Sequence, residues 1–254
     1  MVYEPRKYRS LYREDDLHHF QVVLEETDLD IGIKKEQYTP DLQKKVELFV
    51  AEQRQILKEY IKSHPAFLTT LEPWDPMREK SSAEEKIPTS VIAMCEASRL
   101  AGVGPMAAVA GFFAEQTGSF LTHFLPDVLV ENGGDIWLQS SRKRKVSIYA
   151  GNSPFSQRIG IEINLEETPL GICTSSGTVG HSLSFGRADA VAILAPAAVL
   201  ADAVATAACN LVQESADLTK VVAWAVAIPG VRGAVAILGD KMAVQGDVKL
   251  IPLA

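Results

Sequence analysis

The sequence predicts an α+β protein in which antiparallel strands pack against helices. Helical and strand-like segments come in runs and do not alternate strictly, which argues against a doubly wound parallel sheet. A long run of strand-like segments begins at residue 127, after two apolar helical segments. Over 254 residues, 47% are hydrophobic and 22% are charged, which is typical of a globular chain with a sizeable core.

The first 90 residues combine a predicted meander with one long helix. Three short segments rich in β-forming residues predict the antiparallel meander, and they are residues 7–13, 18–25 and 29–34. Pro40 and Asp41 open a helix of about 20 residues whose apolar positions follow helical spacing. This helix ends at His64-Pro65, because the residue before a proline avoids the helical region. The polar residues 74–86 are expected to form a loop.

Two apolar helices are predicted next, at about residues 88–100 and 104–123. Pro105 can stand near the start of the second helix, where its missing N–H costs nothing. Six strands follow, at residues 127–132, 135–140, 145–150, 158–163, 171–176 and 188–196. An Ala-rich helix at 197–212, a second helix at 217–227 and two or three closing strands complete the expected order.

The charge distribution indicates how these parts fit together. More than half of the charged side chains lie in the first 90 residues. We therefore expect one domain over residues 1–254, with the charged meander and helix of residues 1–90 packing on the apolar core of residues 91–254. The net charge of -7 argues against a nucleic-acid partner, because nucleic acids require a basic field. The basic run at 142–145 is interpreted as a solvated turn beside a strand.

The compartment is expected to be the cytoplasm, with no membrane partner. The three cysteines follow no metal-binding or disulfide pattern, which favours reduced thiols. The N-terminus has no apolar core and no cleavage site of the signal-peptide kind. The longest apolar stretch, residues 100–114, is shorter than the about 20 residues that a membrane span needs.

Two glycine-containing turns are candidates for ligand contact. Residues 102–105 precede a helix whose N-terminal N–H groups can bind an anion, although a tight turn between helices is the commoner explanation. Asn132, Gly133, Gly134 and Asp135 form a polar cluster between two apolar strands, which suits a ribose, purine or flavin edge. The alternative is a plain hairpin turn, because Asn-Gly is its strongest sequence signal.

A loop of small hydroxylated residues follows the strand at 171–176. Such loops can bind phosphate through backbone N–H groups. Its candidate ligand contacts are Thr174, Ser175, Ser176, Gly177 and Thr178. His181 is a candidate general base, although a lone histidine is more often structural. No lysine follows the glycines as in a Walker loop, and there is no nucleophile elbow.

Asp202 and Thr206 are the candidate metal ligands. They stand four residues apart among alanines, so on a helix they share one face. A carboxylate in such an apolar helix is costly unless it is paired or bound to a metal. Carboxylate and hydroxyl oxygens suit Mg²⁺, with phosphates and waters completing its coordination. The alternative is an aspartate that caps a helix or interacts with its dipole.

Three of these segments, in this order, resemble the ApbE-like proteins, the FAD:protein FMN transferases. The matching residues are Asn-Gly-Gly-Asp-Ile at 132–136, Thr-Ser-Ser-Gly at 174–177 and Ala-Asp-Ala-Val-Ala-Thr-Ala at 201–207. Over most of its length the chain is more similar to a sister family of ApbE-like proteins. The segments at 101–111 and 173–191 are typical of that sister family.

The resemblance implies a T-fold with packed helices and FAD in a cleft. It also implies that Mg²⁺ binds the FAD pyrophosphate and that FMN passes to a hydroxyl of an acceptor protein. Asp202 and Thr206 would then hold the metal. The residues beside the ligand would be Gly133, Gly134, Asp135, Thr174, Ser176 and Gly177.

One family motif is replaced in this chain. The His-Ile-Ile-Asp-Pro motif is absent, and His181 follows Gly177 by four residues and precedes Ser-Leu-Ser-Phe-Gly. The resemblance to the sister family also points to sulfide assimilation and homocysteine formation. An alternative function is therefore a sulfur enzyme with Cys173 or His181 as the reactive group. A third alternative is a binding or accessory protein that uses the amphipathic helix at 41–63 for a partner or forms a homodimer.

Overall fold

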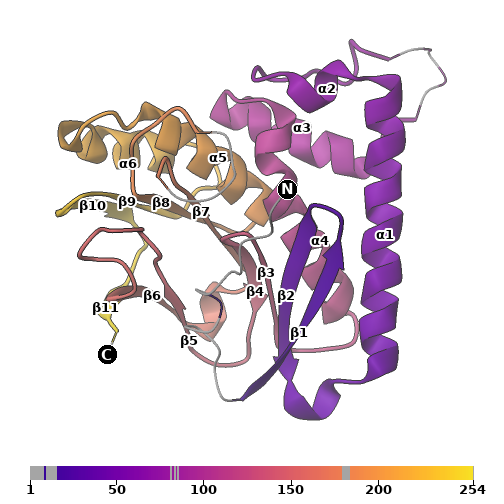
Figure 1. Cartoon of the computed structure of the whole chain (residues 1–254), viewed down its shortest axis with the longest axis horizontal. Coiled ribbons are helices and arrows are strands. Elements are labelled where there is room, and N and C mark those ends of the chain that lie inside the picture. The colour runs from indigo at the N-terminus through magenta and orange to yellow at the C-terminus, as the bar shows by residue number, and fades with distance from the viewer. Residues whose placement is uncertain are drawn as a thin grey trace.

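The computed structural model describes residues 9, 16–80, 82, 84, 86–178 and 184–253. Three layers are visible in Figure 1: a layer of helices, a large twisted sheet and a smaller sheet at the face away from the helices. All neighbouring strands in both sheets are antiparallel. The predicted fold class, α+β with antiparallel sheets and packed helices, is confirmed.

The large sheet has eight strands. In spatial order they are β1 (Leu17–Leu24), β2 (Thr27–Lys34), β3 (Val128–Asn132), β4 (Asp135–Gln139), β7 (Leu170–Ser175), β8 (Ala190–Ala195), β9 (Gly233–Leu238) and β10 (Lys241–Gly246). The hairpin β1–β2 joins the sheet through β3, where Leu29 pairs with Asn132. Of the predicted first strand, residues 7–13, only Arg9 belongs to the described residues.

The smaller sheet contains two of the predicted strands, which lie between β4 and β7 in the sequence. It has the order β11 (Leu250–Pro252), β6 (Ile159–Ile163) and β5 (Arg144–Ser147). The hairpin β5–β6 therefore leaves the large sheet, and the C-terminal β11 pairs with it. Its apolar side chains pack on one face of the large sheet, where residues such as Leu129, Ile136 and Ile172 are buried.

The helices cover the other face of the large sheet. Their bounds are α1 (Pro40–Ser63), α2 (Ala66–Thr69), α3 (Thr89–Ala101), α4 (Val109–Thr122), α5 (Ala198–Leu211) and α6 (Leu218–Val226). Thr39 caps α1 by accepting a hydrogen bond from the N–H of Leu42, and Pro40 occupies its first turn. The predicted helix at 104–123 begins as a 3-10 turn, Pro105–Ala108, before α4.

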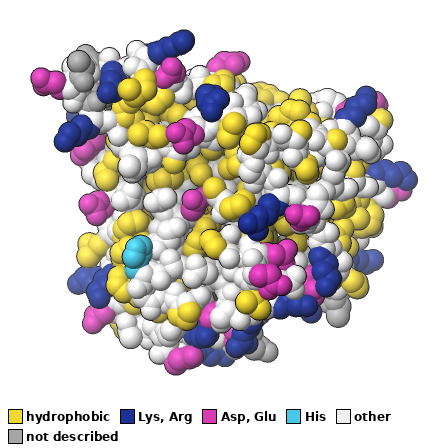
Figure 2. All heavy atoms as spheres, turned by 180° about the vertical axis from the view of Figure 1, so that it is seen from behind, with side chains coloured by type: hydrophobic (Ala, Val, Ile, Leu, Met, Phe, Trp, Pro, Cys, Tyr) yellow, Lys and Arg dark blue, Asp and Glu magenta, His cyan; other side chains and the backbone are white. Residues whose placement is uncertain are grey.

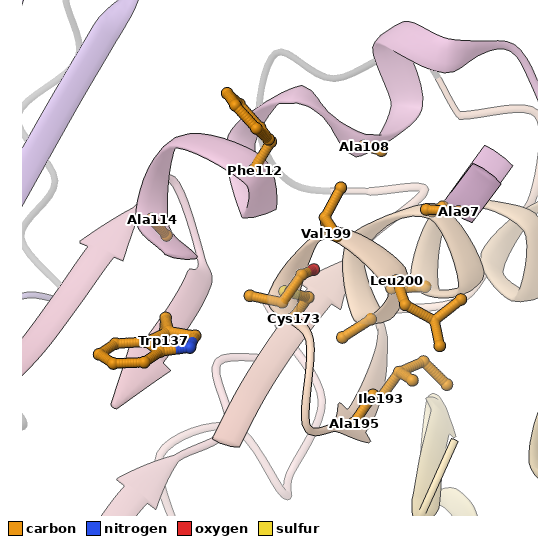
Figure 3. Close-up of a cluster of buried hydrophobic side chains, with 14 of the residues drawn as sticks. Ala97, Ala108, Phe112, Ala114, Trp137, Cys173, Ile193, Ala195, Val199 and Leu200 are labelled. Carbon is orange, nitrogen blue, oxygen red and sulfur yellow. The ribbon is translucent and has the colours of Figure 1, made fainter. Parts of the chain in front are cut away.

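The strand residues alternate between two cores, as the pleat requires. Val128, Val130 and Trp137 face the helices, and the intervening Leu129 and Ile136 face the smaller sheet. Close packing depends on small residues, because a Cβ on Gly118 of α4 would lie only 2.0 Å from the Trp137 ring. Figure 3 shows Trp137 beneath Ala114 of α4, within the buried cluster between helices and sheet.

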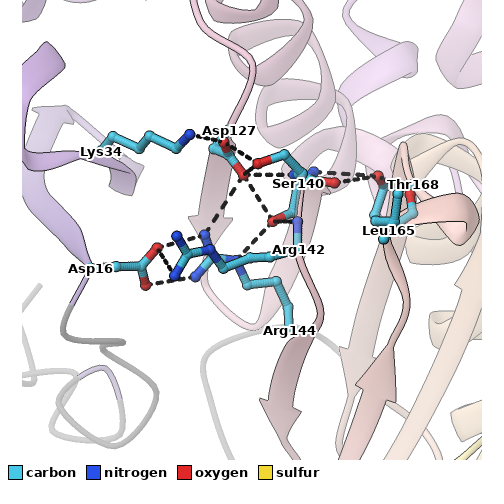
Figure 4. A network of polar contacts seen from close by, with 9 residues as sticks. Asp16, Lys34, Asp127, Ser140, Arg142, Arg144, Leu165 and Thr168 are labelled. Carbon is cyan, nitrogen blue, oxygen red and sulfur yellow. Dashed lines mark hydrogen bonds and ion pairs between the residues drawn. The ribbon is translucent and has the colours of Figure 1, made fainter.

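An ion-pair network lies at the end of the sheet where β3 begins and β4 ends (Figure 4). Asp127 contacts Lys34 at 2.9 Å and accepts hydrogen bonds from the hydroxyls of Ser140 and Ser141. Arg144 is buried, and its guanidinium donates to both carboxylate oxygens of Asp16 at 2.8 and 3.1 Å. The interpretation of residues 142–145 as a solvated turn is therefore wrong for Arg144, which closes this network.

The surface carries charges of both signs. On the face opposite to the view of Figure 1, Lys and Arg side chains lie among Asp and Glu side chains (Figure 2). Among the described residues, only a bent pair of helices, 89–101 with 105–122 at 102°, reaches the length and apolar composition of a membrane span, and no single helix does.

Candidate functional site

The polar cluster at 131–135 is the turn of the hairpin β3–β4. Asn132 and Asp135 face each other across it, and Gly133 and Gly134 have φ values of 71° and 105°. These left-handed values favour glycine at both central positions, as in the hairpin that Asn-Gly predicts. The hairpin interpretation and the ligand interpretation therefore describe the same turn, and the first does not exclude the second.

Side chains on both sides hold this turn in place. The N–H of Gly134 donates to Glu131 Oε1 at 2.7 Å. Asn132 Nδ2 donates to the carbonyl of Ala110, at the start of α4, at 3.1 Å. The predicted ligand contact Asn132 is thus buried and used to attach the turn to the helix layer.

The turn meets the small-residue loop at the end of β7. Asp135 pairs with Cys173 across the two strands, and its carboxylate accepts a hydrogen bond from the backbone N–H of Thr174. A Cβ on Gly134 would lie 3.5 Å from the Thr174 carbonyl oxygen. The structure therefore brings together two segments that the sequence separates by about 40 residues.

The loop that follows is held by its own hydroxyl groups and by the next strand. The N–H of Thr178 donates to Ser176 Oγ at 3.1 Å, and Thr178 Oγ1 donates to Asp189 at 3.2 Å. The N–H of Gly177 donates to the Ala188 carbonyl at 2.9 Å. Ser175 is buried and its hydroxyl lies against the thiol of Cys209 on α5. Ser176 is half-buried, and Gly177 and Thr178 are exposed, while His181 lies outside the described residues.

Asp202 is on α5 and binds the first turn of α4. Its Oδ2 accepts a hydrogen bond from the N–H of Gly111 at 2.8 Å. The helices can approach because residue 111 is glycine, since a Cβ there would lie 2.3 Å from the Ala198 carbonyl oxygen. Thr206 stands one turn further along α5 and is half-buried. The capping role that the sequence left open for Asp202 exists, but it serves α4 and not α5.

Asp135 and Asp202 form a buried pair of carboxylates with raised pKa values. Burial raises the pKa of Asp202 to about 7, against hydrogen bonds from the backbone N–H groups of Gly111 and Ala110. Burial, and next the negative charge of Asp202, raise the pKa of Asp135 well above its ordinary value. Neither carboxylate forms an ion pair with a Lys or Arg in the described part of the chain.

Cys173 lies beside Asp135 and the start of α5. Figure 3 shows its side chain pointing from β7 toward the start of α5, beside Val199. Its Sγ is 3.3 Å from the Ala198 carbonyl, and its thiol also contacts the carboxylate of Asp135. Burial and the neighbouring acidic groups raise the pKa of this thiol well above its ordinary value. At neutral pH Cys173 is therefore a protonated thiol, which is a poor nucleophile and a poor metal ligand.

The donor set suits a hard cation that brings other ligands with it. Within the described residues, no three His, Cys, Asp or Glu side chains are placed to hold a metal ion by themselves. Mg²⁺ does not require such a cage, because it commonly binds one or two carboxylates together with phosphates and water. The carboxylates of Asp135 and Asp202 and the hydroxyl of Thr206 fit this pattern.

Sequence reasoning missed two glutamates of the site, the buried Glu131 and the half-buried Glu115. Glu131 holds the turn, and Glu115 of α4 accepts a hydrogen bond from the N–H of Val199 at 3.1 Å. Glu115 is the single carboxylate in the apolar segment 104–123, which is the same signal that identified Asp202. Glu131 interrupts a predicted apolar strand, which also marks a polar group that needs a buried partner.

Comparisons with known proteins agree with the fold and identify the family. A family model described as AbpE bacteria matches residues 9–243, and the chain belongs to this family of ApbE-like proteins. Within it, the chain is similar to UPF0280 proteins. That of Methanocaldococcus jannaschii is 34% identical over 90% of each chain, and that of Methanopyrus kandleri is 38% identical over 91% of each chain.

Solved structures show the same fold at low sequence identity. The ApbE protein of Thermotoga maritima has a TM-score of 0.56 at 12% identity, over 91% of this chain and 96% of that one. The flavin transferase ApbE of Vibrio cholerae has a TM-score of 0.50 at 13% identity, with the same coverage. At these identities the likeness concerns the fold alone.

Proposed function

We propose that this protein binds a flavin nucleotide, with FAD as the first candidate, together with Mg²⁺ at the junction of β4, β7 and α5. The observation that carries the proposal is the buried pair Asp135 and Asp202. A buried carboxylate without a cationic partner is costly, and a divalent cation removes that cost. The name flavin transferase, printed for the Vibrio cholerae structure, supports a flavin as the ligand to test first.

Each part of the site has one task in this proposal. Asp202, oriented by the N–H of Gly111, and Asp135, oriented by the N–H of Thr174, hold the metal with the hydroxyl of Thr206. A bound Mg²⁺ supplies positive charge that offsets the two carboxylates and the phosphates of the ligand.

The exposed part of the site faces the ligand. The loop at 176–178, which is exposed at Gly177 and Thr178, offers hydroxyl and backbone groups to phosphate. The glycines at 133–134 allow a ligand to approach the backbone closely. The loop residues and the turn residues thus supply polar contacts, while the two carboxylates supply charge.

A transferase reaction is the next step of the proposal. An acceptor hydroxyl on another protein would form a bond to the FMN phosphorus of FAD, and the phosphoanhydride bond would break to release AMP. The acceptor proton needs a general base, and the sequence offers His181 for it. The alternative of a sulfur enzyme with Cys173 as the reactive group is disfavoured, because this thiol is fully buried and has a raised pKa. The same alternative with His181 stays a prediction, since His181 lies outside the described residues.

The first experiment is a flavin titration with and without Mg²⁺. FAD and FMN fluorescence is measured on the wild type, on Asp202→Asn and on Asp127→Asn. Asp127 is a matched control, because it is a buried aspartate at the opposite end of β3 and has its own cation. We expect Mg²⁺-dependent binding in the wild type and in Asp127→Asn, and at least about tenfold weaker binding in Asp202→Asn.

Two results would reject the proposal. The first is that neither flavin binds to the folded wild type with Mg²⁺ present. The second is that Asp202→Asn binds FAD as tightly as the wild type, which would leave Asp202 with only its contact to α4. Circular dichroism of each variant shows whether a lost signal reflects unfolding.

A further inference from the structure

Arg9 is buried on the large sheet although it comes from the N-terminal region. Only 3% of its surface is exposed. Its Nε donates to Glu131 Oε2 at 2.6 Å, and its Nη1 donates to Asp28 Oδ1 at 2.8 Å. Its Nη2 donates to the backbone carbonyl of Asp28 at 2.7 Å. Because three nitrogens of the planar guanidinium are engaged, the contacts fix its orientation as well as its position.

Glu131 connects Arg9 to the turn of the candidate site. One oxygen of its carboxylate accepts from Arg9, and the other accepts the N–H of Gly134 at 2.7 Å. Gly134 has a φ of 105° and directly precedes Asp135. A chain of two hydrogen bonds therefore leads from the N-terminal region to the residue before a proposed metal ligand.

The charge of Arg9 is needed for this chain of contacts. Glu131 is fully buried, and a buried carboxylate that loses a cationic partner is destabilised. Without Arg9, Glu131 loses the guanidinium that fixes the orientation of its carboxylate. A carboxylate that can turn is a weaker acceptor for the N–H of Gly134.

We propose that Arg9 is a positioning residue of the ligand site, which acts through Glu131 to hold the Gly134–Asp135 turn in its binding geometry. The effect on ligand binding rests on the function proposed above. The effect on the turn rests only on the hydrogen bonds and is independent of any ligand.

The test compares Arg9→Met and Arg9→Lys with Arg144→Met. Arg144 is a matched control, because it is equally buried and pairs with a carboxylate, Asp16, at the opposite end of β3 and β4. Two quantities are measured on each folded variant: FAD quenching with Mg²⁺, and the hydrogen-exchange rate of the Gly134 amide without ligand.

We expect both Met variants to be less stable than the wild type. Only Arg9→Met should speed exchange at Gly134 and weaken FAD binding, by about 10-fold to 100-fold. Arg9→Lys should give an exchange rate and an FAD affinity between those of the wild type and Arg9→Met. It keeps the positive charge but loses the planar guanidinium. Unchanged exchange at Gly134 in Arg9→Met overturns the proposal, as does an equal change in Arg144→Met.

Two further outcomes are separable. If the wild type binds no flavin, the proposed function fails, and the exchange rate still decides whether Arg9 holds the turn. If Arg9→Met does not fold, Arg9→Lys is combined with Glu131→Gln. The double variant should then exchange at Gly134 no faster than the more affected single variant, because both changes interrupt one link. Additive effects would show that the two residues act separately.

Discussion

Asp202 and Glu115 each bind the first turn of the helix that carries the other. Asp202 of α5 accepts the N–H of Gly111 at 2.8 Å, and Glu115 of α4 accepts the N–H of Val199 at 3.1 Å. Neither helix has a side-chain cap at its own N-terminus. Negative charge at a helix N-terminus is favourable, so each carboxylate stabilises its partner helix and fixes the contact between them.

This exchange of caps predicts different effects for two substitutions of Asp202. Asp202→Ala should lower the free energy of unfolding by about 1–3 kcal/mol, because the N–H of Gly111 is left without a partner. Asp202→Asn should retain most of the stability, because an amide oxygen can still accept that hydrogen bond. Urea unfolding at pH 7 measures both.

Glu115→Ala and Glu115→Gln give the matched comparison on the other helix. Their effects on the free energy of unfolding should have the same order, with the larger loss in Glu115→Ala. Equal losses for Ala and Asn at position 202 would contradict a capping role.

The raised pKa of Asp202 predicts that stability falls as the pH rises. The folded protein holds this proton up to about pH 7, whereas an unfolded aspartate releases it near pH 4. Between these values the folded state binds more protons, so its contribution is complete below about pH 4 and is lost as the pH rises through about 7. The loss is on the order of a few kcal/mol, since one pKa unit corresponds to about 1.4 kcal/mol.

Denaturant unfolding at pH 5, 6, 7 and 8 on the wild type and on Asp202→Asn checks this expectation. The decrease in the free energy of unfolding between pH 5 and pH 8 should be smaller in Asp202→Asn, because an asparagine side chain has no proton to release. Asp135→Asn should reduce the loss of stability as well, because burial and the charge of Asp202 raise the pKa of Asp135 in the folded protein. An identical loss in all three proteins would contradict raised pKa values at these two carboxylates.

Asp127 predicts the opposite dependence on pH. Burial raises the pKa of this group, but Lys34 and hydrogen bonds from Ser141 and Ser140 outweigh burial and lower the pKa below its ordinary range. The contribution of ionised Asp127 to the stability of the folded state is therefore present above about pH 4 and is lost as the pH falls. Asp127→Asn should lower stability by about 2–3 kcal/mol at pH 7, and by less at pH 3.

Asp240→Asn is the control, because this aspartate is exposed and pairs only with a neighbouring lysine among the described residues. Its effect should stay within about 0.5 kcal/mol at both pH values. The prediction fails if Asp127→Asn is as harmless as Asp240→Asn at pH 7.

The three thiols are expected to be unreactive in the folded protein. Cys95, Cys173 and Cys209 are all buried, and burial raises the pKa of each, that of Cys95 to about 12. Reaction with a disulfide reagent at pH 7.5 should therefore be slow in buffer and should reach three thiols per chain in denaturant. One fast thiol that mass spectrometry assigns to Cys173 would revive the hypothesis of a sulfur enzyme.

The local structure was largely predictable from the sequence. The Ala-rich helix expected at 197–212 is α5, Ala198–Leu211, and the strand expected at 171–176 is β7, Leu170–Ser175. Periodicity reports which face of a segment is buried, and turn residues report where it ends. Both signals are local, so they place the turn at 131–135 correctly, whereas Thr174 and Ser175 of the expected loop belong to β7.

The partners of these segments were not predictable in the same way. Nothing near residue 145 indicates that β5 and β6 leave the large sheet, because a strand in either sheet shows the same alternation. The contacts of Asp202 with Gly111 and of Arg9 with Glu131 join residues 91 and 122 positions apart. The amino-acid sequence indicates that a charged residue in an apolar segment needs a partner. Only the three-dimensional fold shows which residue that partner is.

The pairing of β11 with β6 sets an order on biosynthesis. Leu250 lies opposite Ile161, so the smaller sheet gains its third strand only after residue 250 has left the ribosome. Until then, the nascent protein exposes the edge of β6 and part of the apolar face that this sheet covers. A strand about 90 residues after β6 thus closes the second core, and a ribosome stalled before residue 250 would hold a chain with that core open.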